Sequence, residues 1–166
     1  MEQSFERLGK RTDVDLKGII NSLVEEAVQL TGSTLGYFAV TDDALTTLTM
    51  IAWSKNAMAQ CSVMEMPLIY PVEATGLWGD CIRERTAVIT NDYDACTRPT
   101  KKGYPDGHVP IKRHLNVPVW EGNQIRGILG VGNKLDDYSD RDAELLQAFA
   151  NAAWPSILEA QARAAR

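Results

Sequence analysis

The sequence predicts an α+β fold, with a mostly antiparallel sheet and the two terminal helices packed on one face of it. Apolar residues recur at helical spacing near both ends of the chain, and β-branched and aromatic runs typical of strands lie between them. Short turns join two pairs of these runs as hairpins. The 166 residues fit one domain, and a content of 45% apolar and 23% charged residues excludes a disordered or fibrous chain.

The first half of the chain is expected to form a helix followed by strands. Residues 1–12 are polar and are assigned to a flexible segment before the domain. A helix is predicted from Asp13 because apolar residues recur there every three or four positions: Leu16, Ile19, Ile20, Leu23, Val24, Ala27 and Leu30. Strands follow at 34–41 and 45–53, and 62–68 is a weaker third strand.

A middle helix and a long irregular segment come next. The helix is expected over 72–85, beginning near Gly76, and a short buried strand over 87–90. Prolines and glycines punctuate residues 91–110, and they exclude a continuous helix or strand there. Loops of this length in compact domains are usually functional or mobile, which singles this segment out.

The chain ends with a hairpin and a long helix. Strands are predicted at 114–120 and 124–133, and three glycines of the second strand indicate close approach of another backbone or a ligand: Gly127, Gly130 and Gly132. Ser139, with Asp142 three residues further on, is expected to cap the last helix. Residues 161–166, rich in alanine and arginine, are assigned to the start of a linker helix.

Composition excludes several classes of protein. The chain has 22 acidic and 17 basic residues, and its net charge of −5 argues against a nucleic-acid-binding or polybasic membrane-binding domain. No apolar run approaches the roughly 18 residues of a membrane span, and the N-terminus lacks the apolar region of a secretory signal. Cys61, Cys81 and Cys96 are odd in number and widely spaced, which predicts reduced thiols in a cytoplasmic protein and no zinc site.

Two motifs resemble those of the GAF domain family. The first is Gly-Leu-Trp-Gly at 76–79, at the start of the expected middle helix. The second is the hairpin, with Leu-Asn-Val-Pro-Val at 115–119 and Ile-Arg-Gly-Ile-Leu-Gly-Val at 125–131.

A third motif resembles a subgroup of that family. Gly-Asn-Lys at 132–134, with Tyr138 and Asp142, is similar to the Asn-Lys…Phe…Asp-Glu pattern of cyclic-nucleotide-binding GAF domains. Tyr138 stands where that pattern has phenylalanine, and Ala143 stands where it has glutamate.

The long loop resembles a bacterial subgroup found in sensor histidine kinases and cyclic-dinucleotide enzymes, through Asn-Asp-Tyr at 91–93, Gly-His at 107–108, and Arg113. The resemblance covers residues 13–160, which are assigned to one GAF domain. It implies a six-stranded antiparallel sheet with the terminal helices on one face, often paired with a second copy. It also implies a ligand pocket on the other face, under the middle helix and the long loop.

The candidate ligand-binding residues are those that the resemblance places around this pocket: Trp78, Asp92, Tyr93, His108 and Arg113. Five basic residues against Asp106 give residues 98–114 a charge of +4, which would suit an anionic ligand. Each of these residues also has a structural alternative. The basic loop would simply be solvated, His108 would be a structural hydrogen-bonding residue, Asp92 would cap backbone amides and Trp78 would belong to the core. His114, which opens a strand, is weighed in the same way.

We expect a non-catalytic domain that senses a small molecule within a cytoplasmic signalling protein. Its ligand and any cofactor are unidentified. The domain is expected to form a homodimer through its terminal helices. One alternative is a thiol redox enzyme resembling the free methionine sulfoxide reductases of this fold. Those enzymes carry a cysteine about a dozen residues before the Val-Pro-Val strand, where this chain has Gly107-His108, and Cys96 lies too far upstream. The other alternative is a ligand-free dimerisation module.

Overall fold

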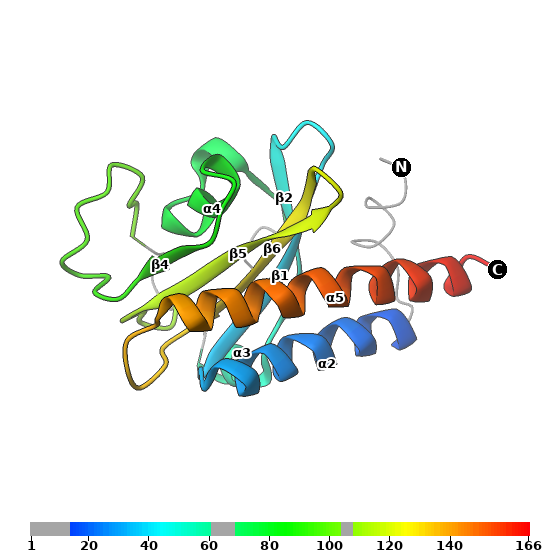
Figure 1. The fold of residues 1–166 in the computed structure, drawn as a ribbon, viewed down its shortest axis with the longest axis horizontal. Coiled ribbons are helices and arrows are strands. Elements are labelled where there is room, and N and C mark those ends of the chain that lie inside the picture. The colour runs from blue at the N-terminus through cyan, green and yellow to red at the C-terminus, as the bar shows by residue number, and fades with distance from the viewer. Residues whose placement is uncertain (1–13, 61–68, 104–107) are drawn as a thin grey trace.

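The computed structural model describes residues 14–60, 69–103 and 108–166. Within these ranges six strands form one sheet in the order β3–β2–β1–β6–β5–β4, and every neighbouring pair is antiparallel (Figure 1). The strands are β1 (Leu35–Thr41), β2 (Thr47–Trp53), β3 (Ile69–Pro71), β4 (Val88–Thr90), β5 (His114–Glu121) and β6 (Gln124–Gly132). The predicted α+β class with a six-stranded antiparallel sheet is therefore confirmed.

Two long helices, α2 (Val14–Thr31) and α5 (Asp140–Ala164), lie side by side on one face of the sheet (Figure 1). The side chain of Ser139 accepts a hydrogen bond from the amide of Asp142, whose carboxylate accepts one from the amide of Ser139, so the predicted capping box is present. The main core fills the space between these helices and the sheet, and its largest fully buried members are Ile20, Leu115, Ile157, Leu146 and Trp154.

The middle helix is much shorter than the sequence predicts. Two short 3₁₀ turns, η1 (Val72–Ala74) and η2 (Leu77–Gly79), precede a four-residue helix, α4 (Asp80–Arg83). Thr75 (ψ 144°) and Gly76 (ψ −141°) lie between the turns with non-helical backbone. The prediction of one helix over 72–85 is therefore wrong, because the chain changes direction at these two residues.

Two further elements differ from the sequence prediction. The strand predicted at 62–68 lies outside the described residues, and the third strand that the structure describes is β3. A short helix that was not predicted, α3 (Lys55–Gln60), follows β2. Ser54 accepts a hydrogen bond from the amide of Ala57 at 3.3 Å, so a serine cap in front of this helix was the available signal.

The second face of the sheet carries α4 and the loop that follows β4 (Figure 1). A smaller apolar cluster, separate from the main core, lies between α4 and the sheet: Ala39, Leu48, Met50, Val72, Cys81, Ile82, Val88, Ile125 and Ile128. Among the described residues, no helix has both the length and the apolar character that crossing a membrane requires.

Candidate functional site

A cavity of about 480 Å³ lies on the sheet face opposite α2 and α5. Strands β1, β2, β5 and β6 contribute its floor. We call the opposite wall the roof. It is formed by Leu77 and Trp78 of η2 and by Tyr93, His108, Val109 and Ile111 of the long loop. A volume of this size is typical of small-molecule and cofactor sites.

The cavity is lined mainly by apolar and aromatic side chains. Five aromatic residues besides the histidines face it: Tyr37, Trp53, Tyr70, Trp78 and Tyr93. The indole of Trp78 stands edge-on to Tyr37, with ring centroids 5.9 Å apart, and to Tyr70, at 5.3 Å. None of the lining residues that the structure describes is Asp, Glu, Lys or Arg, so the described part of the lining carries no permanent charge.

A hydrogen-bonded chain of three side chains supplies the cavity with polar atoms. The Tyr37 hydroxyl donates to Asn116 Oδ1 at 2.5 Å, and Asn116 Nδ2 lies 2.7 Å from His114 Nδ1. Asn116 is only 1% exposed and His114 only 8% exposed. We call these three residues the polar chain of the cavity; all of them line it.

Burial keeps both ends of the polar chain uncharged near neutral pH. Loss of solvation lowers the pKa of His114 to about 4, against the smaller opposing effect of the Asp80 carboxylate. Burial likewise raises the pKa of Tyr37 well above its ordinary value. The polar chain therefore presents neutral hydrogen-bonding groups to the cavity.

Gly130 makes room for the polar chain. On the sheet, Gly130 of β6 stands between Tyr37 of β1 and Asn116 of β5. A Cβ atom at this position would lie 2.1 Å from the Tyr37 ring and 2.5 Å from Asn116 Oδ1. The expected close approach of another backbone is found at Gly127, where a Cβ would lie 2.3 Å from the carbonyl oxygen of Ala39. At Gly130 side chains approach instead, and at Gly132 the nearest atom would lie at an ordinary 3.5 Å.

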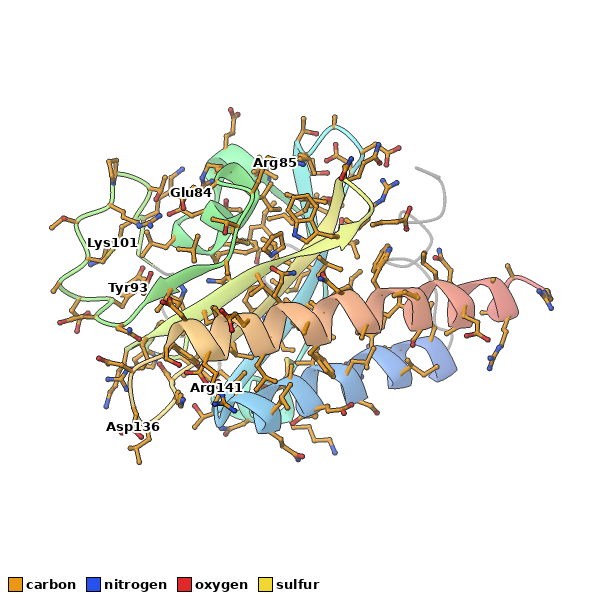
Figure 2. The ribbon with its side chains drawn as sticks, in the orientation of Figure 1. Glu84, Arg85, Tyr93, Lys101, Asp136 and Arg141 are labelled. Carbon is orange, nitrogen blue, oxygen red and sulfur yellow. The ribbon has the colours of Figure 1, made fainter. Side chains whose placement is uncertain are left out.

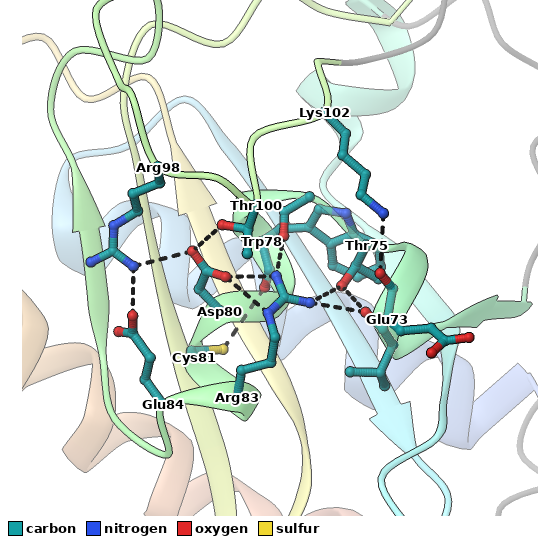
Figure 3. Close-up of polar contacts among 12 residues, drawn as sticks. Glu73, Thr75, Trp78, Asp80, Cys81, Arg83, Glu84, Arg98, Thr100 and Lys102 are labelled. Atoms are coloured by element: carbon teal, nitrogen blue, oxygen red, sulfur yellow. Dashed lines mark hydrogen bonds and ion pairs between the residues drawn. The ribbon is translucent and has the colours of Figure 1, made fainter.

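A buried carboxylate fastens the long loop to α4 (Figure 3). The side chain of Asp80 is 3% exposed, and its Oδ1 accepts from the Arg83 guanidinium at 2.6 and 3.0 Å. Its Oδ2 accepts from Arg98 at 3.1 Å and from the Thr100 hydroxyl at 2.8 Å. Because Arg98 and Thr100 belong to the loop, Asp80 holds the loop against the helix beside the cavity.

Two further basic side chains of the loop, Lys101 and Lys102, also bind groups of the protein itself. Lys102 Nζ donates to the carbonyl of Glu73 at 3.1 Å, and Lys101 Nζ donates to the carbonyl of Asp94 at 3.0 Å. Lys101 also lies over the Tyr93 ring, 4.8 Å from its centroid (Figure 2). Much of the positive charge that the sequence places in this loop is therefore directed at groups of the protein itself.

Three of the five sequence-predicted site residues line the cavity: Trp78, Tyr93 and His108. Asp92 is exposed, and its Oδ1 accepts from the amide of Ala95 at 3.1 Å, which is the alternative role of a turn cap. Arg113 donates to the carbonyls of Lys134 and Leu135 at 2.7 and 3.0 Å. Neither Asp92 nor Arg113 is among the described residues that line the cavity, so their role in ligand binding stays a prediction.

Sequence reasoning did not single out Tyr37, Asn116 or Asp80. One signal for Asn116 was available: it is an amide side chain in the middle of the apolar strand Leu-Asn-Val-Pro-Val. Asp80 offered none, because an aspartate three residues before an arginine is typical of an exposed pair on a helix surface.

The two described cysteines do not line the cavity. Cys81 belongs to α4 and is fully buried, and burial raises the pKa of its thiol. Cys96 is half-buried in the loop, and Cys61 lies outside the described residues. No cluster of three metal-ligating side chains occurs in the described parts of the chain.

Comparison with known proteins places this architecture in a family. A family model described as a GAF domain matches residues 13–157. The chain is 43% identical over 159 residues to the methyl sulfide methyltransferase-associated sensor of Methanosarcina acetivorans. The match covers 96% of this chain and 16% of that relative, so the chain corresponds to a small part of a much longer protein.

Solved structures share the fold at low sequence identity. The GAF domain of a phosphoenolpyruvate-protein phosphotransferase from Coxiella burnetii is 16% identical, with a TM-score of 0.72 over 99% of this chain and 94% of that one. The free methionine-R-sulfoxide reductase of Neisseria meningitidis, solved with its substrate, is also 16% identical, with a TM-score of 0.66 over 98% and 87% of the two chains. The sheet order, the two helices on one face, the roofed cavity on the other and the matched family model together show that this chain belongs to the GAF domain family.

Proposed function

We propose that this chain is the sensory domain of a signalling protein, and that it binds a small molecule in the cavity between the sheet and the roof. The observation that carries this proposal is a cavity of about 480 Å³ that contains one buried, neutral polar chain. A pocket with a few placed polar groups in an apolar lining is the usual form of a small-molecule site. The relative that is 43% identical is itself named a sensor.

The signal would leave the cavity through the sheet. Tyr37 and Phe38 are neighbours on β1, so their side chains point to opposite faces. Tyr37 lines the cavity, whereas Phe38 packs against Trp154 of α5 with ring centroids 6.5 Å apart. A ligand that favours one position of Tyr37 therefore acts on the packing of α5 through a single strand, and differential binding biases the terminal helices.

We further propose that the roof moves when a ligand enters or leaves. Asp80 fastens the loop through Arg98 and Thr100, and these bonds are polar contacts beside the cavity rather than part of its apolar lining. Breaking them releases the loop without unfolding the sheet. Asp80 would therefore set how readily a ligand enters and leaves.

The same helices would join two copies of the chain. Leu16, Ile20 and Ile157 are among the apolar residues of these helices that are buried in the chain's own core, so they are not available to a second copy. Ile19 (39% exposed) and Leu145 (40% exposed) remain available on α2 and α5. We place this homodimer, and the signalling protein to which it belongs, in the cytoplasm, as the reduced thiols of the sequence suggest.

A regulatory role is favoured over thiol redox catalysis. Neither Cys81 nor Cys96 lines the cavity, and burial disfavours the reactive thiolate of Cys81. A turnover assay with free methionine sulfoxide separates the two functions. We expect no turnover above that of a variant in which all three cysteines are replaced by serine.

Mass spectrometry of the purified protein tests the sensory proposal. We expect native spectra to show a bound small molecule that is released on denaturation. Ala57 lines the cavity, so Ala57→Trp should fill it and abolish this mass difference. Ala95 is exposed in the loop, so the matched variant Ala95→Trp should retain it. A mass difference that survives in Ala57→Trp would contradict the proposal.

A further inference from the structure

We propose that the ligand is an uncharged, planar molecule that accepts a hydrogen bond from His114. This inference rests on the proposed function, because it names the chemical class of the molecule that the cavity binds. It differs from the anionic ligand that the charge of the loop suggests.

The absence of charge in the described lining is the first argument. An ion that enters an apolar site needs a partner of opposite charge, because desolvation of an isolated ion is costly. Two guanidinium groups beside the roof already have acidic partners: Arg83 binds Asp80, and Arg98 binds both Asp80 and Glu84. An anion that recruited either guanidinium would have to break one of these ion pairs, whereas a neutral molecule would not.

The direction of the polar chain is the second argument. Tyr37 donates to Asn116 Oδ1, which leaves Asn116 Nδ2 to donate to His114 Nδ1. A neutral imidazole carries one proton, so a ring that accepts at Nδ1 holds its proton at Nε2. His114 therefore offers the cavity an N–H donor, and the matching ligand atom is a carbonyl oxygen, an ether oxygen or an unprotonated ring nitrogen.

The distribution of aromatic side chains is the third argument. Tyr37 and Trp53 come from the sheet, and Trp78 and Tyr93 come from the roof, so aromatic rings lie on both walls. The Tyr93 ring also lies 6.2 Å from the His114 ring, centroid to centroid. Flat molecules gain most from such walls, because rings attract one another in offset-stacked and edge-to-face arrangements.

Three probes of one shape test the inference. The first is 2-acetylnaphthalene, which is neutral and has a carbonyl acceptor. The second is 2-isopropenylnaphthalene, which replaces the oxygen by a methylene group, and the third is the 2-naphthoate anion. Binding to the purified protein is measured by titration, following the backbone amide signals of Gly36 and Gly132, both of which line the cavity.

We expect the ketone to bind about fivefold more tightly than the alkene, the usual effect of one hydrogen bond, and more than tenfold more tightly than the anion. Equal or tighter binding of naphthoate, or equal binding of the alkene, would overturn the inference and leave the cavity as a ligand site. No shift at Gly36 or Gly132 with any probe would overturn the inference and the proposed function together.

Two variants test whether His114 is the residue that donates the hydrogen bond to the ligand. His114→Phe keeps a ring and removes the N–H, so the preference for the ketone over the alkene should disappear while the alkene still binds. Arg113→Gln is the matched control, because Arg113 does not line the cavity, and it should keep the preference. A preference that persists in His114→Phe would overturn the assignment to His114. If that variant does not fold, the three probes on the unaltered protein still decide whether the ligand is a neutral acceptor.

Discussion

Tyr37 and Asn116 meet across Gly130, and the tyrosine hydroxyl donates to the amide oxygen at 2.5 Å over a residue that has no side chain. Three strands are needed to build this contact. It positions Asn116 to hold His114, so the polar chain of the cavity depends on a glycine in the strand between them.

Replacement of Gly130 by alanine should break the polar chain. The added methyl group would lie 2.1 Å from the Tyr37 ring, so the ring must move and Asn116 loses its donor. We expect the free energy of unfolding to fall by about 2–3 kcal/mol, from overpacking and a lost buried hydrogen bond. Urea denaturation measures this, and Gly18→Ala is the control.

Gly18 is exposed in α2, and a Cβ there would meet nothing within 4 Å. Alanine at this position should raise the free energy of unfolding by about 0.5–1 kcal/mol, because glycine is a poor helix former. If the two substitutions changed the free energy of unfolding equally, Gly130 would not be required for the contact between Tyr37 and Asn116.

Protonation of His114 should destabilise the fold between pH 6.5 and pH 4. Its pKa is about 4 in the folded state, below the ordinary value of 6.5, so the unfolded chain binds the proton more readily across this window. Stability from this group is present above pH 6.5 and is lost as the pH falls, by about 3 kcal/mol in total.

Denaturation of the unaltered protein and of His114→Phe at several pH values isolates this effect. Carboxylates contribute equally to both proteins, and only the unaltered protein loses stability by protonation of His114. The excess free energy of unfolding of the unaltered protein over His114→Phe should therefore decrease as the pH falls from 7 to 4. A difference that is constant across this range would show that His114 keeps an ordinary pKa in the fold.

Replacement of Asp80 by asparagine should loosen the roof. Arg83 and Arg98 would lose their shared counter-charge, and breaking a buried ion pair typically costs about 3 kcal/mol or more. Hydrogen exchange should accelerate at the amides of residues 98–103. Glu84→Gln is the matched control, because Glu84 binds the same Arg98 at the surface and should cost less than about 1 kcal/mol. Similar exchange in the two variants would contradict the role of Asp80.

The two described thiols should differ in reactivity. Cys81 is fully buried and burial raises the pKa of its thiol, whereas Cys96 is half-buried in the loop. Under native conditions a thiol reagent should modify Cys96 well before Cys81, as followed by peptide mass spectrometry. Fast labelling of Cys81 would mean that α4 opens readily.

Ile19 tests the proposed homodimer. It is an exposed isoleucine on α2, so Ile19→Asp should shift a dimer to a monomer in sedimentation at micromolar concentration. Ile69 is more exposed, at 60%, but lies on the edge strand β3, so Ile69→Asp should leave the dimer intact. A monomer in the unaltered protein would contradict the pairing of helices.

Much of the fold could be predicted because local patterns reflect burial. The apolar spacing of α2 predicts its buried face, and the serine cap predicts the start of α5. Each prediction needs only residues of one short segment. The middle helix could not be predicted, because its apolar residues also suit two 3₁₀ turns. The change of direction at Thr75 and Gly76 depends on contacts elsewhere, among them the Arg83 bond to the Gly76 carbonyl.

The lining residues that the sequence analysis named are those that belong to short, recognisable motifs. Trp78, Tyr93 and His108 were recognised by their motifs, and they do line the cavity. The contacts of the basic loop could not be predicted, because the charge of a residue does not show where its side chain points. Arg98 forms an ion pair with Asp80, an acidic residue outside the loop. Tyr37 and Asn116 lie 79 positions apart, so their bond requires the strand order of the sheet.

The most direct test of the sensory account is a crystal structure of the protein as purified, with its bound small molecule retained and identified from the same preparation. The account predicts density for a flat, uncharged molecule between Trp78 and the sheet, with an acceptor atom about 2.7–3.2 Å from His114 Nε2. A cavity closed by its own side chains, or a molecule bound elsewhere on the domain, would contradict it.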